Sequence, residues 1–307
     1  MPELPEVETI RRGLEAHLVG RTILGVEVRE TRLRRPLNAG RLRRFVSGRR
    51  IGAVRRRAKY LILEMEGGGY LLVHLGMTGQ FFMARPGRPR IPHEHLVFAL
   101  DDGRTLRFAD TRRFGLLEPV EAGAPEAHPL LRGLGPEPLG GALEARAFRA
   151  ATRALRKPIK NFLLDSRALA GVGNIYACEA LFRARVHPAL PLSGLDEARW
   201  SRLLSALARV LREAVARGGT TLHDFVNAEG DAGFFQFRLR VYDRAGKPCP
   251  ACRAPIRRIV QAGRSTYFCP ACQPRRRRAA GAAGRPAARP RRIAPGGRVA
   301  DTREGAA

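Results

Sequence analysis

The stretch Cys249–Cys272 reads CPACRAPIRRIVQAGRSTYFCPAC, so sixteen residues separate two Cys-Pro-Ala-Cys pairs. Two thiolate pairs at this spacing are typical of a tetrahedral zinc site between two turns, and four cysteine ligands leave no open coordination position. We therefore predict one structural Zn²⁺, held by Cys249, Cys252, Cys269 and Cys272. Two unrelated redox or buried cysteine pairs are the alternative. The fifth cysteine, Cys178, is predicted to be a packed small apolar residue.

Basic residues lie between the cysteine pairs and throughout the rest of the chain. The 307 residues include 56 Lys and Arg against 28 Asp and Glu, which gives a net charge of +28. This excess favours a polyanionic partner that contacts an extended face of the protein. The segment between the pairs, with Arg264 next to Thr266, Tyr267 and Phe268, is a candidate DNA contact. A genome rich in G and C also inflates arginine content, and this is the alternative origin of the charge.

The composition also excludes several classes of protein. With 44% hydrophobic and 27% charged residues, the chain is not disordered as a whole. No apolar run approaches the roughly 18 residues of a membrane span. The start MPELPEVETI is acidic and lacks the apolar core of a secretory signal. Residues 274–307 hold ten Arg against one Asp and one Glu, have no hydrophobic periodicity and are predicted to form a disordered basic tail.

Residues 1–119 have the pattern of an N-terminal β-sandwich domain that carries a helix at its start. Pro2 and Pro5 suit a first helical turn, and apolar residues then recur at near-helical spacing: Val7, Ile10, Leu14 and Leu18. Short β-like runs punctuated by Gly and Pro follow, at 22–28, 50–54, 60–65, 70–75, 95–100 and 105–108. This arrangement predicts an all-β sandwich or barrel with the helix packed on it.

Residues 120–142 are rich in Pro, Gly and Ala and are predicted to be a linker. Helical patterns follow at 144–155, 158–165, 175–183 and 196–217, which defines a helical domain over residues 143–236. A small two-stranded unit with the cysteines closes the fold at residues 237–273. The sequence therefore predicts an α+β multidomain chain.

Pro2 follows a methionine that can be removed because the second residue is small. Removal leaves a secondary amine, which can attack an aldehyde-like sugar carbon and form an iminium that acts as an electron sink. Glu3 lies next to this amine and is a candidate proton donor or shuttle. The alternative is that Pro2 only initiates a helix with an acidic first turn.

Four further segments carry candidate contacts. Lys59 stands directly before an apolar strand and is a candidate phosphate ligand or acid, with a solvated charge run as the alternative. The Gly-flanked turns 74–79 and 110–115 carry Met77, Arg112 and Phe114, which are wedge residues between bases or, alternatively, core anchors. The turn Gly171–Asn174 presents backbone N–H groups at a helix start, which is an anion-binding arrangement that nearby basic residues strengthen.

Taken together, six segments resemble the formamidopyrimidine-DNA glycosylase (Fpg) family, in the family's order and over residues 2–273. They are PELPEVET at 2–9, RAKYL at 57–61, HLGM at 74–77, RRFG at 112–115, LDSR at 164–167 with GVGNIY at 171–176, and the four-cysteine finger. The opening PELPEVE favours this branch over the related endonuclease VIII branch.

The resemblance implies a bifunctional base-excision enzyme that acts on damaged double-stranded DNA. It implies a β-sandwich that carries Pro2, a helix–two-turn–helix domain and a zinc finger, in a bacterial protein of the cytoplasm and nucleoid that works as a monomer without a membrane. In this scheme Pro2 is the nucleophile and Glu3 is the acid/base at the sugar. Lys59 is a proton donor and phosphate ligand, and Arg264 binds the phosphate at the lesion and is linked to δ-elimination. Met77, Arg112 and Phe114 fill the gap left by the flipped nucleotide, and Asn174, His93 and Arg156 contact DNA. Glu6 is similar to an acid near the base pocket, and the segment 218–236 is similar to a base-capping loop.

Three alternatives stay open from the sequence. A non-catalytic DNA-binding protein on the same scaffold would use Pro2 only as a helix start. An enzyme of the endonuclease VIII-like branch would act on oxidised pyrimidines. A zinc-ribbon RNA-binding or ribosomal accessory protein fits the charge but gives no reason for Pro2, Lys59 and the wedge residues.

Overall fold

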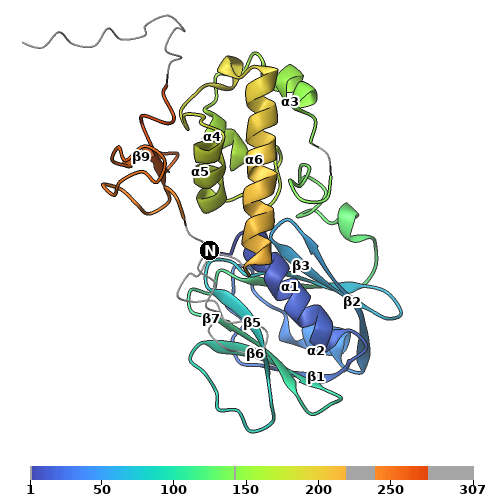
Figure 1. Cartoon of the computed structure of the whole chain (residues 1–307). Helices are drawn as coiled ribbons and strands as arrows, with labels where there is room; N and C mark the ends of the chain where they lie inside the picture. Colours follow the sequence, from blue (N-terminus) through green and yellow to red (C-terminus); the bar gives the residue numbers. More distant parts are fainter. Residues whose placement is uncertain (1, 142, 219–238, 276–307) are drawn as a thin grey trace, which may run out of the picture. The chain divides into compact units, whose positions relative to one another are not determined.

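The computed structural model describes residues 2–141, 143–218 and 239–275 (Figure 1). The segment resembling a base-capping loop lies outside the described residues except for its first residue, and so do residues 276–307 of the predicted tail. Residues 1–275 belong to one compact unit.

The first helix, α1 (Leu4–Leu18), begins where the sequence predicts it. Glu3 is the N-cap residue and forms a capping box with Glu6, while Pro5 stands in the first turn, where a missing N–H costs nothing. The buried face of α1 carries Val7, Ile10, Leu14 and Leu18 as expected. The capping box therefore fixes the backbone at the point where Pro2 joins the helix.

Eight antiparallel strands follow: β1 (Thr22–Val28), β2 (Arg49–Arg57), β3 (Tyr60–Met65), β4 (Tyr70–His74), β5 (Gly79–Ala84), β6 (Glu94–Leu100), β7 (Thr105–Asp110) and β8 (Leu116–Val120). They are hydrogen-bonded in the order β5-β7-β6-β1-β2-β3-β4-β8. The two halves of this order join only where Thr22 and Ile23 of β1 pair with Arg50 and Arg49 of β2. Apolar residues from both halves share one core with α1, so the predicted β-sandwich with a helix packed on it is confirmed.

The sequence patterns missed three elements of this domain. Strand β5 is a nearly continuous buried run without alternation, and β8 contains Pro119, which weakens a strand signal. The helix α2 (Ala39–Val46) is short and arginine-rich, and the side chain of Asn38 caps it by accepting from the Arg41 N–H. Leu131, in the segment predicted as a linker, lies buried against Ile62, Tyr70 and Leu72. This part of the segment therefore packs on the sheet.

The helical part contains α3 (Ala145–Thr152), α4 (Ile159–Leu163), α5 (Asn174–Arg183) and α6 (Glu197–Ala216), with short 3₁₀ turns at Pro125–Ala127 and Leu192–Gly194. Figure 1 shows α6 extending from the helical part to α1, which it contacts. The hairpin of β9 (Arg257–Gln261) and β10 (Arg264–Phe268) follows. None of the helices in the described ranges combines the length and apolar content needed to cross a membrane.

Candidate active site

Glu3 lies at the junction between the start of α1 and the start of α5. Its side chain is buried, and its carboxylate accepts from the Ile175 N–H at 3.0 Å and the Tyr176 N–H at 3.5 Å. Because N–H groups at a helix start carry partial positive charge, they stabilise a carboxylate there. The sequence predicted an anion site at this turn, and the group that accepts from these two N–H groups is the carboxyl group of Glu3.

Two glycines make room for this contact. A Cβ at Gly173 would lie 2.1 Å from the carboxyl carbon of Glu3, and one at Gly171 would lie 2.5 Å from Cδ1 of Leu4. Gly171 also has a φ of +88°, which an L side chain rarely adopts. The Gly-Val-Gly sequence is therefore needed for the close approach of α1 to the turn before α5.

A second acid, Glu6, completes the buried part of the junction. It accepts from the backbone N–H of Glu3 at 2.8 Å and from the hydroxyl of Tyr176 on α5. Both carboxylates are nearly inaccessible to solvent. A backbone and a side-chain contact thus tie the first turn of α1 to α5.

Lys59 occupies the turn between β2 and β3, as the sequence pattern predicts. Ala58, directly before it, has a φ of +52°, and the Ala58 N–H donates to Oε1 of Glu137 at 2.6 Å. Glu137 also accepts from the guanidinium groups of Arg56 and Arg57. The strained turn is therefore held by a carboxylate from the predicted linker.

Burial changes the acidity of both groups at this junction. Removal from water raises the pKa of Glu3 above its ordinary value, an effect that Lys59 opposes and Glu6 reinforces. Removal from water also lowers the pKa of Lys59, which the charges of Glu3 and Glu6 partly offset. Each shift brings the pKa closer to neutrality, as proton-transfer groups require.

The β9–β10 hairpin brings Arg264 into the same electrostatic environment, since its charge helps to lower the pKa of Lys59. The residues after Arg264 are bound to the helical part. The buried ammonium of Lys160 donates to the Thr266 hydroxyl at 2.6 Å, and the Asn174 amide donates to the Ser265 carbonyl at 2.9 Å. Helices α4 and α5 therefore position the strand that begins with Arg264.

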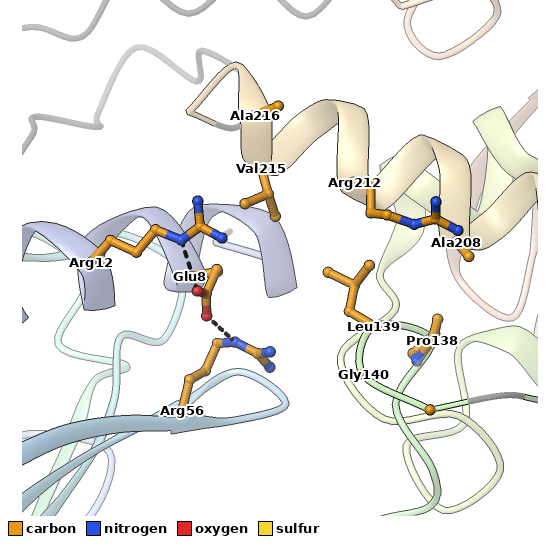
Figure 2. A pocket seen from close by; sticks show the side chains of 11 residues that line it. Glu8, Arg12, Arg56, Pro138, Leu139, Gly140, Ala208, Arg212, Val215 and Ala216 are labelled. Atoms are coloured by element: carbon orange, nitrogen blue, oxygen red, sulfur yellow. Dashed lines mark hydrogen bonds and ion pairs between the residues drawn. The ribbon is translucent and has the colours of Figure 1, made fainter.

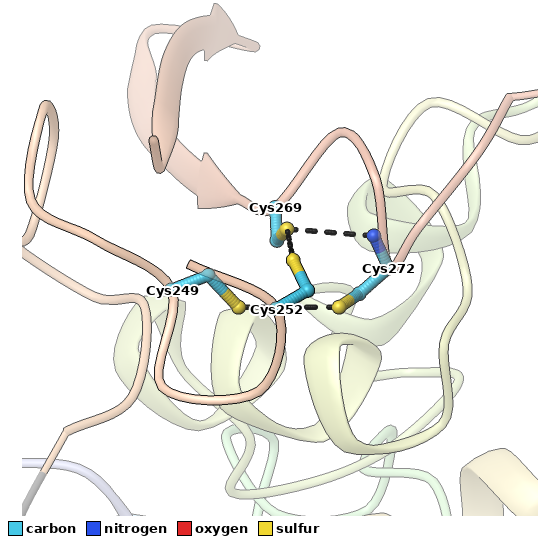
Figure 3. A group of neighbouring side chains, drawn as sticks. All are labelled: Cys249, Cys252, Cys269 and Cys272. Carbon is cyan, nitrogen blue, oxygen red and sulfur yellow. Dashed lines mark hydrogen bonds between the residues drawn. The ribbon is translucent and has the colours of Figure 1, made fainter. Parts of the chain in front are cut away.

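The four cysteines of the finger converge on one point (Figure 3). All four sulfur atoms lie within 4.8 Å of one another, with Sγ–Sγ distances of 3.9 Å between Cys249 and Cys272 and 3.4 Å between Cys252 and Cys269. Four thiolates around a zinc ion with bonds of about 2.3 Å stand at similar separations. The donor set and its spacing thus fit one tetrahedral zinc ion that pins the hairpin.

Met77, Arg112 and Phe114 lie on two neighbouring loops of the sandwich. Met77 is 37% exposed and Phe114 is 45% exposed, which are high values for large apolar side chains. The guanidinium carbon of Arg112 lies 4.8 Å from the centre of the Phe114 ring. The structure therefore brings these three residues together on the surface, which disfavours the alternative that they are core anchors.

The remaining two predicted contacts are not joined to this set. His93 is exposed at the start of β6 with a φ of +60°, and its carbonyl accepts from the Asp110 N–H. Arg156 is exposed between α3 and α4. No contact between Arg156 and the other predicted site residues is found within the described ranges.

A cavity of about 510 Å³ lies elsewhere, between α1, α6 and residues 138–141 (Figure 2). Glu8 stands in it and accepts from Arg12 and Arg56, so its charge is balanced from two sides. These arginines, together with Arg11, hold the pKa of Glu8 below its ordinary value. None of the predicted site residues lines this cavity.

Comparisons with known proteins match this architecture over most of the chain. Family models match in three successive parts: the formamidopyrimidine-DNA glycosylase N-terminal domain at residues 1–117, the formamidopyrimidine-DNA glycosylase H2TH domain at 134–226, and the zinc finger found in FPG and IleRS at 246–275. The chain belongs to the formamidopyrimidine-DNA glycosylase family.

Individual members of the family are similar along their whole length. The formamidopyrimidine-DNA glycosylase of Thioalkalivibrio sulfidiphilus is 50% identical over 273 residues, which cover 89% of this chain and 100% of that protein. The Lactococcus lactis Fpg in complex with abasic-site DNA has a TM-score of 0.80 and 35% identity, with 89% of this chain and 99% of that chain covered. The MutM (Fpg) protein of Thermus thermophilus has a TM-score of 0.77 and 47% identity, with 89% of this chain and 98% of that chain covered.

Within this Fpg framework, the sequence patterns missed two residues of the junction. His74 contacts the ring of Tyr60 and lies near Lys59, and burial lowers the pKa of His74 to about 4. Tyr176 donates to Glu6, although the sequence placed it only in a helix-start motif. His74 is the first residue of the HLGM segment that also contains Met77. Its place in this segment was the signal that could have identified it.

Proposed function

We propose that this chain is a bifunctional DNA glycosylase and AP lyase that excises oxidised purines, namely 8-oxoguanine and formamidopyrimidines, from duplex DNA in base excision repair. The observation that carries the proposal is the junction at Glu3, in a chain of the Fpg family. There a buried carboxylate follows Pro2 and shares its electrostatic environment with Lys59. Structures of the Lactococcus lactis relative in complex with damaged DNA support a DNA substrate.

The reaction begins at Pro2, whose nitrogen becomes a secondary amine once Met1 is removed. That nitrogen forms a bond to C1′ of the deoxyribose while the bond from C1′ to the damaged base breaks, and the departing base takes up a proton. The C1′–O4′ bond of the sugar then breaks as O4′ takes up a proton, and the nitrogen lone pair forms the C1′=N iminium. This iminium makes the C2′ proton acidic. Loss of this proton expels the 3′ phosphate, and a second elimination expels the 5′ phosphate, which is a β,δ-elimination.

The remaining catalytic roles are those that the resemblance to the family implies, and charge and burial support them. Glu3 exchanges protons at the sugar, since its raised pKa lets the carboxyl group hold a proton closer to neutrality. Lys59 donates a proton linked to β-elimination and binds phosphate. Arg264, at the start of β10, grips the phosphate at the lesion and assists δ-elimination.

The DNA contacts follow from the need to reach a base that is stacked in a duplex. The lesion must be flipped out, and this leaves a gap that Met77, Arg112 and Phe114 fill. Asn174 binds a DNA phosphate, and His93 and Arg156 are further DNA contacts. Zn²⁺ on the four cysteines stabilises the finger and takes no part in the chemistry. The protein acts as a monomer in the bacterial cytoplasm, associated with the nucleoid.

The domain boundaries of this proposal are those predicted from the sequence. They comprise a catalytic β-sandwich domain at 1–119, a linker at 120–142, a helix–two-turn–helix domain at 143–236, a zinc finger at 237–273 and a basic tail at 274–307. Matches of separate family models to residues 1–117, 134–226 and 246–275 support this division.

Borohydride trapping on an 8-oxoguanine:cytosine duplex tests the proposal. Hydride reduces the iminium to a stable amine, so the wild-type protein should become covalently joined to the DNA, with the bond on the peptide that begins with Pro2. Pro2→Gly and Glu3→Gln should each lower the trapped yield by about 100-fold or more. A protein that binds this duplex but never forms an adduct would be a non-catalytic binder, and the proposal would be wrong.

Thymine glycol in the same duplex separates the two branches of the superfamily. A solved complex of the Lactococcus lactis Fpg contains DNA with an oxidised pyrimidine, so binding alone does not discriminate between lesions. The proposal expects a higher single-turnover excision rate on 8-oxoguanine than on thymine glycol. A reversed preference would assign the chain to an endonuclease VIII-like activity.

A further inference from the structure

One buried carboxylate lies between the two loops that carry Met77, Arg112 and Phe114. We call residues 75–79 and 111–115 the wedge loops. Asp110, at the end of β7, is 1% exposed. Its Oδ2 accepts from the Gly115 N–H at 2.7 Å, and its Oδ1 accepts from the Thr78 hydroxyl at 2.6 Å. The side chain of Asp110 therefore binds both wedge loops.

The hydroxyl of Thr78 links the wedge loops in a second way. It donates to Asp110, and it also accepts from the Arg112 N–H at 3.0 Å. A side chain that fixes the backbone of Arg112 from the loop of Met77 constrains the separation of the two loops. Both hydrogen bonds require an oxygen at this position, because a methyl group neither donates nor accepts.

The backbones of the wedge loops are also in direct contact. Gly76 has a φ of +63°, and a Cβ at this residue would lie 2.4 Å from the carbonyl carbon of Phe114. The Arg34 N–H donates to the Gly115 carbonyl at 3.0 Å and holds the second loop from its other side. The exposed side chains of Met77 and Phe114 therefore project from a base that is packed and hydrogen-bonded.

We propose that Thr78 and Asp110 are positioning residues that hold the wedge loops as one rigid unit, so that Met77, Arg112 and Phe114 enter the duplex together. The inference rests on the proposed function, because it needs a base pair to be opened. Three side chains on independent loops would each lose conformational freedom on insertion, whereas a preorganised unit loses less. Neither Thr78 nor Asp110 contacts the DNA in this account.

The distinguishing feature of such a role is the step that it affects. Opening a base pair requires the wedge, whereas elimination at a preformed abasic site starts from a position that has already lost its base. A positioning role therefore predicts a loss in excision that exceeds the loss in abasic-site cleavage. A residue that merely stabilises the domain would lower both rates together.

Thr78→Val removes the hydroxyl at nearly constant volume, and Thr78→Ser is the matched control that retains it. Asp110→Asn is the second variant, because it replaces the acceptor facing one N–H group with a donor. Single-turnover rates are measured on an 8-oxoguanine:cytosine duplex and on the same duplex with a preformed abasic site. A 2-aminopurine next to the lesion reports unstacking, and thermal unfolding reports stability.

We expect Thr78→Val and Asp110→Asn to lower the excision rate and the rate of 2-aminopurine unstacking by about tenfold, a loss typical of one buried hydrogen bond. Cleavage of the abasic duplex should stay within about twofold of wild type, and Thr78→Ser should restore excision. Equal losses on both substrates, or no loss on either, would overturn the positioning role. If the wild-type protein excises no base, the proposed function fails instead, and the two failures are distinguishable.

Discussion

The junction around Glu3 and the wedge loops use opposite physical means to prepare side chains for DNA. At the junction, Glu3 is 3% exposed and is held by N–H groups of a helix more than 170 residues away in sequence. On the wedge loops, the side chain of Phe114 is 45% exposed, and the buried residue is Asp110, whose carboxylate binds both loops. The first region alters the acidity of its groups, whereas the second fixes only their direction.

This difference decides what a substitution can disturb. In a buried, polar site every atom has a partner, so a change of charge or of one methyl group alters both stability and chemistry. An exposed side chain has few partners to lose, so its truncation should affect function and leave folding nearly unchanged. The following variants test this contrast, beginning with the largest expected effect.

Glu3→Gln should abolish excision while making the protein more stable. Loss of the acid/base should lower the single-turnover rate by about 1,000-fold. Because the pKa of Glu3 is raised from 4.5 by burial, the folded state binds its proton more tightly than the unfolded chain does. Ionisation of Glu3 therefore destabilises the folded state increasingly as the pH rises above 4.5 toward and through the raised pKa.

The thermal stability of this variant checks the sign of that linkage. Near pH 7.5 the melting temperature of Glu3→Gln should exceed that of the wild type, because the neutral amide carries no charge that burial would destabilise. The difference should shrink as the pH falls through the raised pKa toward 4.5, and it should be nearly gone below 4.5. A melting temperature that falls at pH 7.5 would mean that the hydrogen bonds to the charged carboxylate outweigh its burial.

Removal of zinc should disrupt the contacts between the β9–β10 hairpin and helices α4 and α5. Without the metal, Thr266 and Ser265 would no longer be held against Lys160 and Asn174, and Arg264 would lose its position. We expect Cys252→Ala to lower DNA affinity by about 100-fold and to lose bound zinc, measured by fluorescence anisotropy and elemental analysis. Cys178→Ala keeps all four thiolates of the finger and should retain one zinc ion. If the protein bound DNA with equal affinity with and without zinc, the β9–β10 hairpin would not be part of the DNA-binding surface.

The sequence predicted those parts of the molecule that depend on local pattern. The start of α1 at its prolines, the apolar stripe of α1 and the paired cysteines all depend on local spacing along the chain, and each was predicted. Strands such as β5 were missed because a strand buried on both faces has no alternation. Local pattern gave Lys59 as a candidate phosphate ligand or acid and the segment of Arg264 as a candidate DNA contact. The resemblance to a family linked these two residues to particular elimination steps.

Long-range contacts could not be predicted in this way. The turn at Gly171–Gly173 has the composition of a phosphate site. Only the fold shows that the side chain of Glu3 lies against this turn and accepts from the N–H groups of Ile175 and Tyr176, which follow it. The same holds for Glu137, whose contact with the Ala58 N–H joins segments that share no sequence pattern. Such contacts depend on tertiary packing, which periodicity and spacing do not encode.

Gly173→Ala should separate the effect of shape from that of charge at the junction. Gly173 has a φ of −123°, which alanine adopts freely, but the added Cβ would overlap the carboxylate of Glu3. We expect displacement of Glu3 to lower the excision rate by about 10- to 100-fold. Gly133→Ala is the matched control, because a Cβ there meets nothing within 4 Å, and it should stay within about twofold of wild type. Unchanged excision in Gly173→Ala would show that the position of Glu3 is not critical.

Phe114→Ala tests the wedge loops and should have the smallest effect on the stability of the protein. Because the ring is largely exposed, its loss should shift the melting temperature by less than about 1 °C, while excision from an 8-oxoguanine:cytosine duplex falls by about tenfold. Leu24→Ala removes an apolar side chain on β1 that is also largely exposed, at 61%, and should change neither quantity. A large drop in melting temperature for Phe114→Ala would contradict the contrast, since the ring would then stabilise the wedge loops instead of only projecting from them.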